Sequence, residues 1–74
     1  MKKRTFKRAY IEFNEYYNYF AVCVSKITRY EDENYIESED EDDIEHVGGF
    51  GTKEEALAYI HETYPRIKEI IDED

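Results

Sequence analysis

With 74 residues the chain is long enough for one small domain, which we expect to cover residues 1–74, and too short for two. It carries 19 acidic residues against 10 Lys or Arg, a formal charge of −9, and such a field repels nucleic acid and anionic membranes and favours basic partners. A single cysteine excludes an internal disulfide, and no apolar run has the length of a membrane span or the pattern of a signal peptide, so we expect a cytoplasmic protein.

Charge is divided unevenly along the chain. Residues 1–30 carry seven Lys or Arg against two Glu, a net charge of +5. Residues 31–74 carry three Lys or Arg against seventeen acids, a net charge of −14. We expect a basic N-terminal extension at residues 1–4 and a folded surface whose acidic side is much the larger.

The first predicted element is a strand from Thr5 to Phe13, because apolar residues alternate there with polar ones and place Ala9, Ile11 and Phe13 on one face. Asn14 and Glu15 then predict a tight turn, since Asn tolerates the left-handed backbone that such turns need. These signals indicate a β-hairpin.

Its second arm, Tyr16 to Tyr30, is rich in β-branched and aromatic residues. Apolar side chains occupy both faces of its middle, with Phe20, Val22 and Val24 on one face. We therefore expect a central strand that is covered on one side by a helix. The whole core should be rich in aromatic residues, because eight Tyr and four Phe are the chain's largest apolar groups.

The segment 31–45 has ten acids in fifteen residues, and like charges at this density resist packing. We expect an acidic loop region over residues 31–45, interrupted by a short third strand at Asn34 to Ser38. A fourth strand, Ile44 to Phe50, is predicted next, weakened by its glycines.

The strongest signal is a helix within Phe50 to Ile71. Thr52 and Glu55 have the spacing of a capping box, in which each side chain accepts a hydrogen bond from a backbone N–H near the helix start. Apolar residues then recur at steps of three and four and form one stripe that needs a partner surface. These residues are Leu57, Ile60, Tyr64, Ile67 and Ile71.

Pro65 interrupts this helix, since a proline removes one hydrogen bond and clashes with the preceding turn. Either the helix kinks at this point, or it ends and Pro65 begins a second short helix. The stripe keeps its phase across Pro65, which favours a bent pair of helices on one surface. The predicted fold is α+β: a three- or four-stranded antiparallel meander with a C-terminal helix, kinked or split at Pro65, packed on one face.

The glycine-rich run at residues 48–53 precedes the helix but does not match a phosphate-binding loop. Its glycines lack the required spacing, the order is Gly-Thr-Lys, and two glutamates that follow would repel a phosphate. We expect a flexible connection between strand and helix.

Metal binding and catalysis have weak support. The acidic segment with His46 lacks the spacing of a calcium-binding EF-hand, and one histidine is too few for a usual zinc site. Cys23 with His46 or His61 is the sole nucleophile and base pair, and Cys23 sits among apolar residues. We expect no enzyme activity, no metal and no cofactor.

The concentration of carboxylates predicts a protein-binding surface. The acids of the 31–45 segment, together with three glutamates spaced by seven residues that would share one helix face, form an array resembling a nucleic-acid backbone. The candidate partner-binding residues are Glu37, Glu39, Asp40, Glu41, Asp42, Asp43, Glu45, Glu55, Glu62 and Glu69. Their expected partner is a Lys/Arg-rich site, such as the nucleic-acid groove of a larger enzyme.

This pattern favours a small inhibitor or DNA mimic of the kind that phages and mobile elements use against host defence. One alternative is a structural or assembly homodimer that uses a sheet edge or Tyr16, Tyr17 and Tyr19. Another is a nucleic-acid binder that uses the basic residues of the N-terminus, which the total charge disfavours.

The passage Gly51-Thr52 followed by Glu54-Glu55-Ala56-Leu57, placed after strands and opening a helix, is similar to the strand-to-helix junction of small antitoxin domains of the HicB type. That likeness implies an antitoxin-like module as a further alternative. It covers a short stretch, and the other usual features of those domains are missing here.

Overall fold

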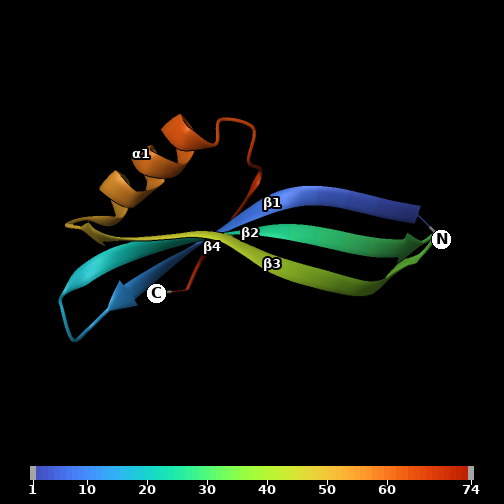
Figure 1. Cartoon of the computed structure of the whole chain (residues 1–74), viewed down its shortest axis with the longest axis horizontal. Helices are drawn as coiled ribbons and strands as arrows, with labels where there is room; N and C mark the ends of the chain where they lie inside the picture. Colours follow the sequence, from blue (N-terminus) through green and yellow to red (C-terminus); the bar gives the residue numbers. More distant parts are fainter. Residues whose placement is uncertain (1, 74) are drawn as a thin grey trace.

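The computed structural model describes residues 2–73, which form a four-stranded mixed sheet and one helix (Figure 1). The elements in chain order are β1 (Lys2–Asn14), β2 (Tyr19–Asp32), β3 (Tyr35–Phe50), α1 (Lys53–Thr63) and β4 (Glu69–Asp72). The strand order is β3-β2-β1-β4; β2 is antiparallel to both β1 and β3, whereas β4 is parallel to β1. The α+β class and the β1-β2-β3 meander are confirmed.

The predicted alternation in β1 places its apolar residues beneath α1. Ala9 pairs with Val24 and Ile11 with Val22, so that all four side chains point to the same face of the sheet. The buried core cluster consists of Ala9, Ile11, Val22, Val24, Ala56 and Ile60. The fully buried side chains are thus aliphatic, and aromatic rings such as Phe20, Phe50, Tyr59 and Tyr64 pack around them. The expectation of an aromatic-rich core is therefore wrong for the fully buried centre, and the aromatic rings instead form its margin, where the tyrosines keep their hydroxyls within reach of polar partners.

The β1–β2 connection is longer than expected and places Tyr16 and Tyr17 in the turn. The Asn14 side chain accepts a hydrogen bond from the Tyr17 N–H at 3.1 Å, and the Asn18 N–H donates to the Asn14 carbonyl at 2.8 Å. Asn18, with a φ of 59°, supplies the left-handed backbone that was expected of the residues before it. Strand β2 therefore begins at Tyr19.

The expected acidic loop at 31–45 is wrong: only a tight turn at residues 33–34 separates β2 from the 16-residue strand β3. Successive carboxylates of a strand point to opposite faces, which separates charges that are adjacent in sequence. Cations on β2 also lie opposite them, since Arg29 pairs with Glu39 and Lys26 with Asp42. The two short strands predicted here are parts of one strand, which contains register shifts at β-bulges.

The start of α1 follows the prediction. The Thr52 Oγ1 accepts from the Glu55 N–H at 3.1 Å, and the Glu55 carboxylate accepts from the Gly51 N–H at 3.2 Å. The capping box is confirmed, and with it the junction between β3 and the helix.

The predicted continuation of the helix beyond Pro65 is wrong. Helix α1 ends at Thr63, and Tyr64, which precedes the proline, has a φ of −130° and leaves the helical region. A turn closed by the Ile67 N–H to the Tyr64 carbonyl at 3.0 Å then leads into β4. The last residues of the expected second helix instead belong to strand β4, which pairs with Arg8–Ile11 of β1.

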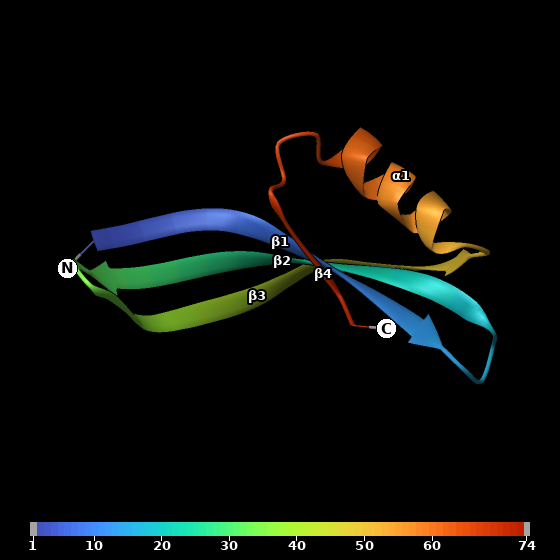
Figure 2. The same cartoon turned by 180° about the vertical axis from the view of Figure 1, so that it is seen from behind.

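Helix α1 covers one end of one face of the sheet, while the other end projects beyond it (Figures 1 and 2). We call this projecting part the arm; it comprises residues 2–8, 25–32 and 35–43. The molecule measures 43 × 24 × 19 Å. Within residues 2–73, α1 is the only helix, and it lacks the length and the apolar character that a membrane crossing requires.

Two isoleucine-to-alanine substitutions test this core. Ile60→Ala removes a fully buried side chain and is expected to lower the free energy of unfolding by about 2–5 kcal/mol. Ile71→Ala, at a position that is 40% exposed, serves as the matched control and should cost less than about 1 kcal/mol. Urea unfolding followed by circular dichroism measures both, and equal losses would contradict the placement of the core.

Candidate functional site

Strand β3 is an edge strand, with β2 on one side and no strand of residues 2–73 on the other. Its register with β2 divides its acids between the two faces of the sheet. Asp40 and Asp42 lie on the face toward α1, and Glu39, Glu41 and Asp43 lie on the far face. The edge strand therefore presents carboxylates on both faces of the sheet.

On the far face, one ion-pair cluster neutralises two of the predicted binding residues. Arg29 contacts Glu39 at 2.7 Å and Glu69 at 3.4 Å, and Arg8 contacts the same two carboxylates at 3.2 and 2.9 Å. The Arg29 guanidinium carbon lies 4.9 Å from the centroid of the Phe6 ring, and that of Arg8 lies 5.7 Å from it. Glu39 and Glu69 therefore stabilise the sheet and contribute little free charge to a partner.

This cluster affects the ionisation of its members. Hydrogen bonds from Arg8 and Arg29 hold the pKa of the Glu39 carboxyl below its ordinary value. The same bond to Glu39, and then one to Tyr10, raises the pKa of Arg8. Both partners are fully charged at neutral pH, as the ion pairs require.

Glu45 of β3 connects the sheet to α1 and to the residue that follows it. Its Oε1 accepts hydrogen bonds from the Tyr59 hydroxyl at 2.5 Å and the Tyr64 hydroxyl at 3.2 Å. The bond to Glu45 raises the pKa of Tyr59, whereas burial is the main cause of the raised pKa of Tyr64. Glu45 thus has a structural role at the β3–α1 contact.

Two further acids of the far face accept hydrogen bonds from neutral groups. Glu41 accepts from the Tyr10 hydroxyl at 2.5 Å, and Asp43 accepts from the Ser25 hydroxyl at 3.2 Å. Burial and the contact with Glu41 raise the pKa of Tyr10, so the hydroxyl stays protonated and donates. Because these donors are neutral hydroxyls, Glu41 and Asp43 keep their negative charges without a cation to balance them.

Glu37, Asp40 and Asp42 are exposed and make no side-chain hydrogen bond or ion pair with any residue in the range 2–73. We call these three residues the free acidic strip. Asp40 and Asp42 share one face and are about 6.6–6.8 Å apart along the strand. Of the predicted binding residues, these three have the most available charge.

The predicted helical array of glutamates does not form. Glu55 accepts from the Gly51 backbone, Glu62 is exposed on α1, and Glu69 lies in β4 within the ion-pair cluster. Because the helix ends at Thr63, the three residues share no face. The ten predicted residues therefore do not make one surface.

Packing and backbone conformation explain the glycines at positions 48 and 49. A side chain at Gly48 would lie 2.9 Å from the Tyr19 ring, so glycine permits the close packing of that ring, and Gly49 has a φ of 90°. The Glu55 carboxylate accepts from the Gly51 N–H, a donor that a phosphate at this helix start would use.

Cys23 pairs in register with His46 on the far face, but its surroundings do not activate it. Burial raises the pKa of the Cys23 thiol, and the nearby carboxylates of Asp43 and Glu12 raise it further. Among residues 2–73, no group of three or more His, Cys, Asp or Glu side chains is placed to hold a metal ion.

A second exposed feature lies at the β1–β2 turn. Tyr16 is 87% exposed and Tyr17 66% exposed, and the Tyr17 ring stacks on that of Tyr19 with the centroids 6.0 Å apart. This small aromatic group remains the candidate surface for assembly with a second copy.

No protein-family model matches this chain, and no curated protein or solved structure shows significant similarity to it. The fold and its surfaces define a small α+β domain with an acidic edge strand. Sequence reasoning identified the acids of β3 but missed the arginine partners of Glu39 and Glu69. The available signal was the position of Arg8 two residues after Phe6 in the predicted strand Thr5–Phe13, which places both on the same face.

The Glu39 ion pairs predict a specific pH dependence of stability. Because the folded pKa of Glu39 lies below its ordinary value of 4.5, its ionisation stabilises the fold above that pH, and the contribution is lost as the pH falls through the folded pKa. Glu39→Gln should lower stability at pH 7 and have progressively less effect at acidic pH. Glu37→Gln is the control. Urea unfolding, repeated from pH 7 to below pH 4.5, measures the stability of both variants. The same pH dependence in both would contradict the assignment.

The environment of Cys23 predicts slow alkylation. At neutral pH, iodoacetamide should modify Cys23 in the folded protein more slowly than in the urea-unfolded chain, because the thiolate is the reactive form. Mass spectrometry over time measures both rates. A faster reaction in the folded state would indicate an activated thiol.

Proposed function

We propose that this protein is a non-catalytic binding module that uses β3 to occupy a Lys/Arg-rich site on a larger protein. The supporting observation is the charge density of one extended edge strand: residues 37–45 contain seven acids in nine positions. On one face the carboxylates of Asp40 and Asp42 are about 6.6–6.8 Å apart along the strand, close to the span of two phosphates at ~3.4 Å each along a strand of DNA. The spacing of charge along β3 therefore suits a groove that binds a nucleic-acid backbone.

Preorganisation supports the same proposal. The strand is fixed by the ion pairs of Glu39 and by the hydrogen bonds of Glu41, Asp43 and Glu45. The free acidic strip is consequently held on an ordered backbone before any partner arrives, which reduces the entropy lost on binding. The bound acids position the strand, and the strip supplies the charge.

Charge also favours a different protein over a second copy at this edge. Two β3 strands that paired edge to edge would bring their carboxylates close together, and like charges across a strand pair are destabilising. A basic partner would relieve that repulsion. The partner we propose is a nucleic-acid-binding protein, and the function is its inhibition, as in the defeat of a host defence system.

Neutralising the free acidic strip tests the proposal. The variant carries Glu37→Gln, Asp40→Asn and Asp42→Asn, and the control carries Glu15→Gln, Glu54→Gln and Glu62→Gln, three exposed acids elsewhere. Each of the two variants therefore loses three negative charges. Each immobilised protein is exposed to nuclease-treated lysate of the native host, and bound proteins are eluted with increasing salt.

We expect the wild type and the control to retain a nucleic-acid-binding protein that high salt releases, and the strip variant to bind it roughly ten-fold more weakly or worse. Equal retention by the strip variant, or retention that salt does not affect, would contradict the proposal. Recovery of the protein alone as a dimer would favour assembly through the exposed tyrosines.

A further inference from the structure

A hollow of about 660 Å³ lies between the first half of β1 and the segment that joins α1 to β4. In Figures 1 and 2 this segment descends beside β1 at the base of the arm. Five cationic residues line the hollow against one acidic residue, Glu69. The cations are Arg4, Lys7, Lys26, Arg66 and Lys68. Half of the ten Lys and Arg of a strongly acidic chain thus surround one concave site.

Most of these cations lack an acidic partner. Arg4 contacts Glu31, and the Glu69 carboxylate is engaged by Arg8 and Arg29 in the cluster described above. Within residues 2–73, the other four cations of the hollow form no ion pair, and of these Lys26 has an acid, Asp42, as its cross-strand neighbour. In a chain with 19 acids, such a group of unneutralised cations indicates a site for an anion.

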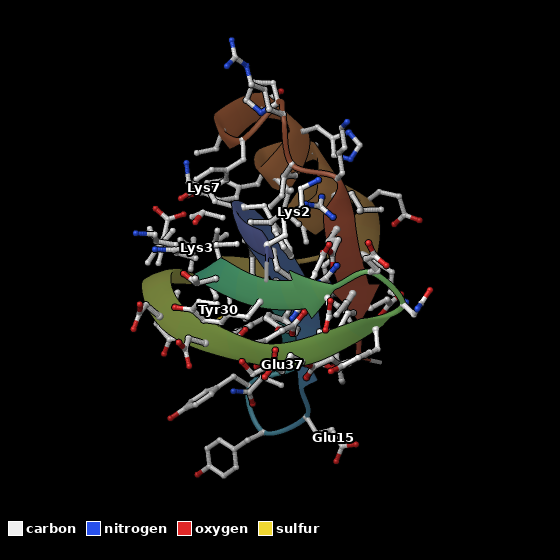
Figure 3. The ribbon with its side chains drawn as sticks, turned by 90° about the vertical axis from the view of Figure 1, so that its right-hand side faces the viewer. Lys2, Lys3, Lys7, Glu15, Tyr30 and Glu37 are labelled. Atoms are coloured by element: carbon white, nitrogen blue, oxygen red, sulfur yellow. The ribbon has the colours of Figure 1, made fainter. Side chains whose placement is uncertain are left out.

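The sheet register strengthens this indication. Lys7 and Lys26 are direct cross-strand partners, and like charges in that position destabilise a sheet. The Lys7 ammonium lies 5.7 Å from the centroid of the Tyr64 ring, which holds it at the hollow. Figure 3, viewed toward the tip of the arm, places Lys7 on the side of α1 and Glu37 on the opposite side of the molecule. An anion between the two lysines would remove their repulsion.

The open backbone edge of β1 at residues 2–7 favours an acidic peptide over a phosphate-containing ligand. Strand β4 pairs with β1 only at Arg8–Ile11, so residues 2–7 have no strand partner on that side among the described residues. The lining of the hollow includes Arg4–Lys7 of this edge. A strand edge offers N–H and C=O groups in alternation, which a peptide can pair with in full, whereas phosphates can use only the N–H groups. Lysines along an edge oppose neutral strands and favour acidic ones.

We propose that the hollow binds an extended acidic peptide segment of a partner protein, which adds to β1 beside residues 2–7 and enlarges the sheet. Alternate residues of this segment face the hollow about 6.6–6.8 Å apart and place carboxylates near Lys7, Lys26 and Lys68. Tyr64 and Ile67 line the same hollow and contact its apolar positions. None of the three residues of the free acidic strip lines the hollow, although Asp42 lies directly opposite Lys26 in the sheet.

A second copy of the chain is a less suitable occupant. Its β3 is acidic and extended, but its insertion would make a head-to-tail contact, which builds rings or open filaments of many copies. Each copy also carries a charge of −9, which opposes repeated association.

The test uses a fluorescent nine-residue peptide with the sequence of residues 37–45, Glu-Ser-Glu-Asp-Glu-Asp-Asp-Ile-Glu, and the full chain. Fluorescence anisotropy should show binding that weakens with salt. The combined substitutions Lys7→Gln, Lys26→Gln and Lys68→Gln should weaken it by at least about ten-fold. Lys68→Gln alone is compared with Lys53→Gln, which removes the same charge from the start of α1. Circular dichroism confirms that the variants fold.

Backbone pairing is tested with two further peptides that carry N-methyl groups on the odd or on the even residues. N-methylation of alternate residues blocks one edge of a strand and leaves the charge unchanged. We expect one pattern to reduce binding about ten-fold and the other to leave it intact. Equal binding of both would show charge attraction alone and overturn strand addition.

Three other outcomes would overturn the proposal. These are no binding of the parent peptide, tighter binding of a nine-nucleotide single-stranded DNA than of the peptide, and oligomers of the chain by itself that disappear in the triple-lysine variant. The variant neutralised in the free acidic strip should bind the peptide at least as tightly as the wild type does, because it loses acids that repel the peptide, including Asp42 opposite Lys26. The proposed function and this site can therefore fail separately.

Discussion

Two arginines and two glutamates, one from each strand, form the interaction on which the sheet depends. Arg8 of β1 and Arg29 of β2 both contact Glu39 of β3 and Glu69 of β4, and their guanidinium groups lie against the Phe6 ring. The contacts join residues up to 61 positions apart. No other cluster within residues 2–73 connects all four strands through side chains.

This cluster replaces a second helical layer. A 74-residue chain has too little apolar surface to cover both faces of a four-stranded sheet, and α1 covers one end of one face. On the far face Ile27, which pairs with Phe6, is nevertheless fully buried. Because the arginine stems and the ring exclude water while the guanidinium groups remain paired, a polar layer protects an apolar residue.

The pairing of charges within this cluster also explains where the remaining charges lie. Acids that neutralise arginines are fixed within the far face, and acids without such partners remain along the outer edge of β3. The cations left over gather at the hollow beside β1. The acidic edge of β3 and the cationic hollow thus lie on either side of β2, whose Lys26 lines the hollow and lies opposite Asp42.

The sequence by itself determined the local elements whose signals lie within a few residues. Alternation in Thr5–Phe13 indicated β1, and Thr52 with Glu55 fixed the start of α1. Pro65 marked an interruption, but local rules allowed either a kink or an end, and the continuing apolar stripe favoured the wrong choice. The tertiary structure decided this, because Ile70 reaches the core as part of a strand beside Ala9.

Only the tertiary structure could also decide the fate of the acidic segment. Local repulsion predicts a loop at 31–45, whereas pairing with β2 places its carboxylates on alternate faces and opposite cations that come from distant parts of the chain. The partners of Glu39 are not encoded within its own segment. They are set by the register of three strands, and register is a property of the assembled sheet.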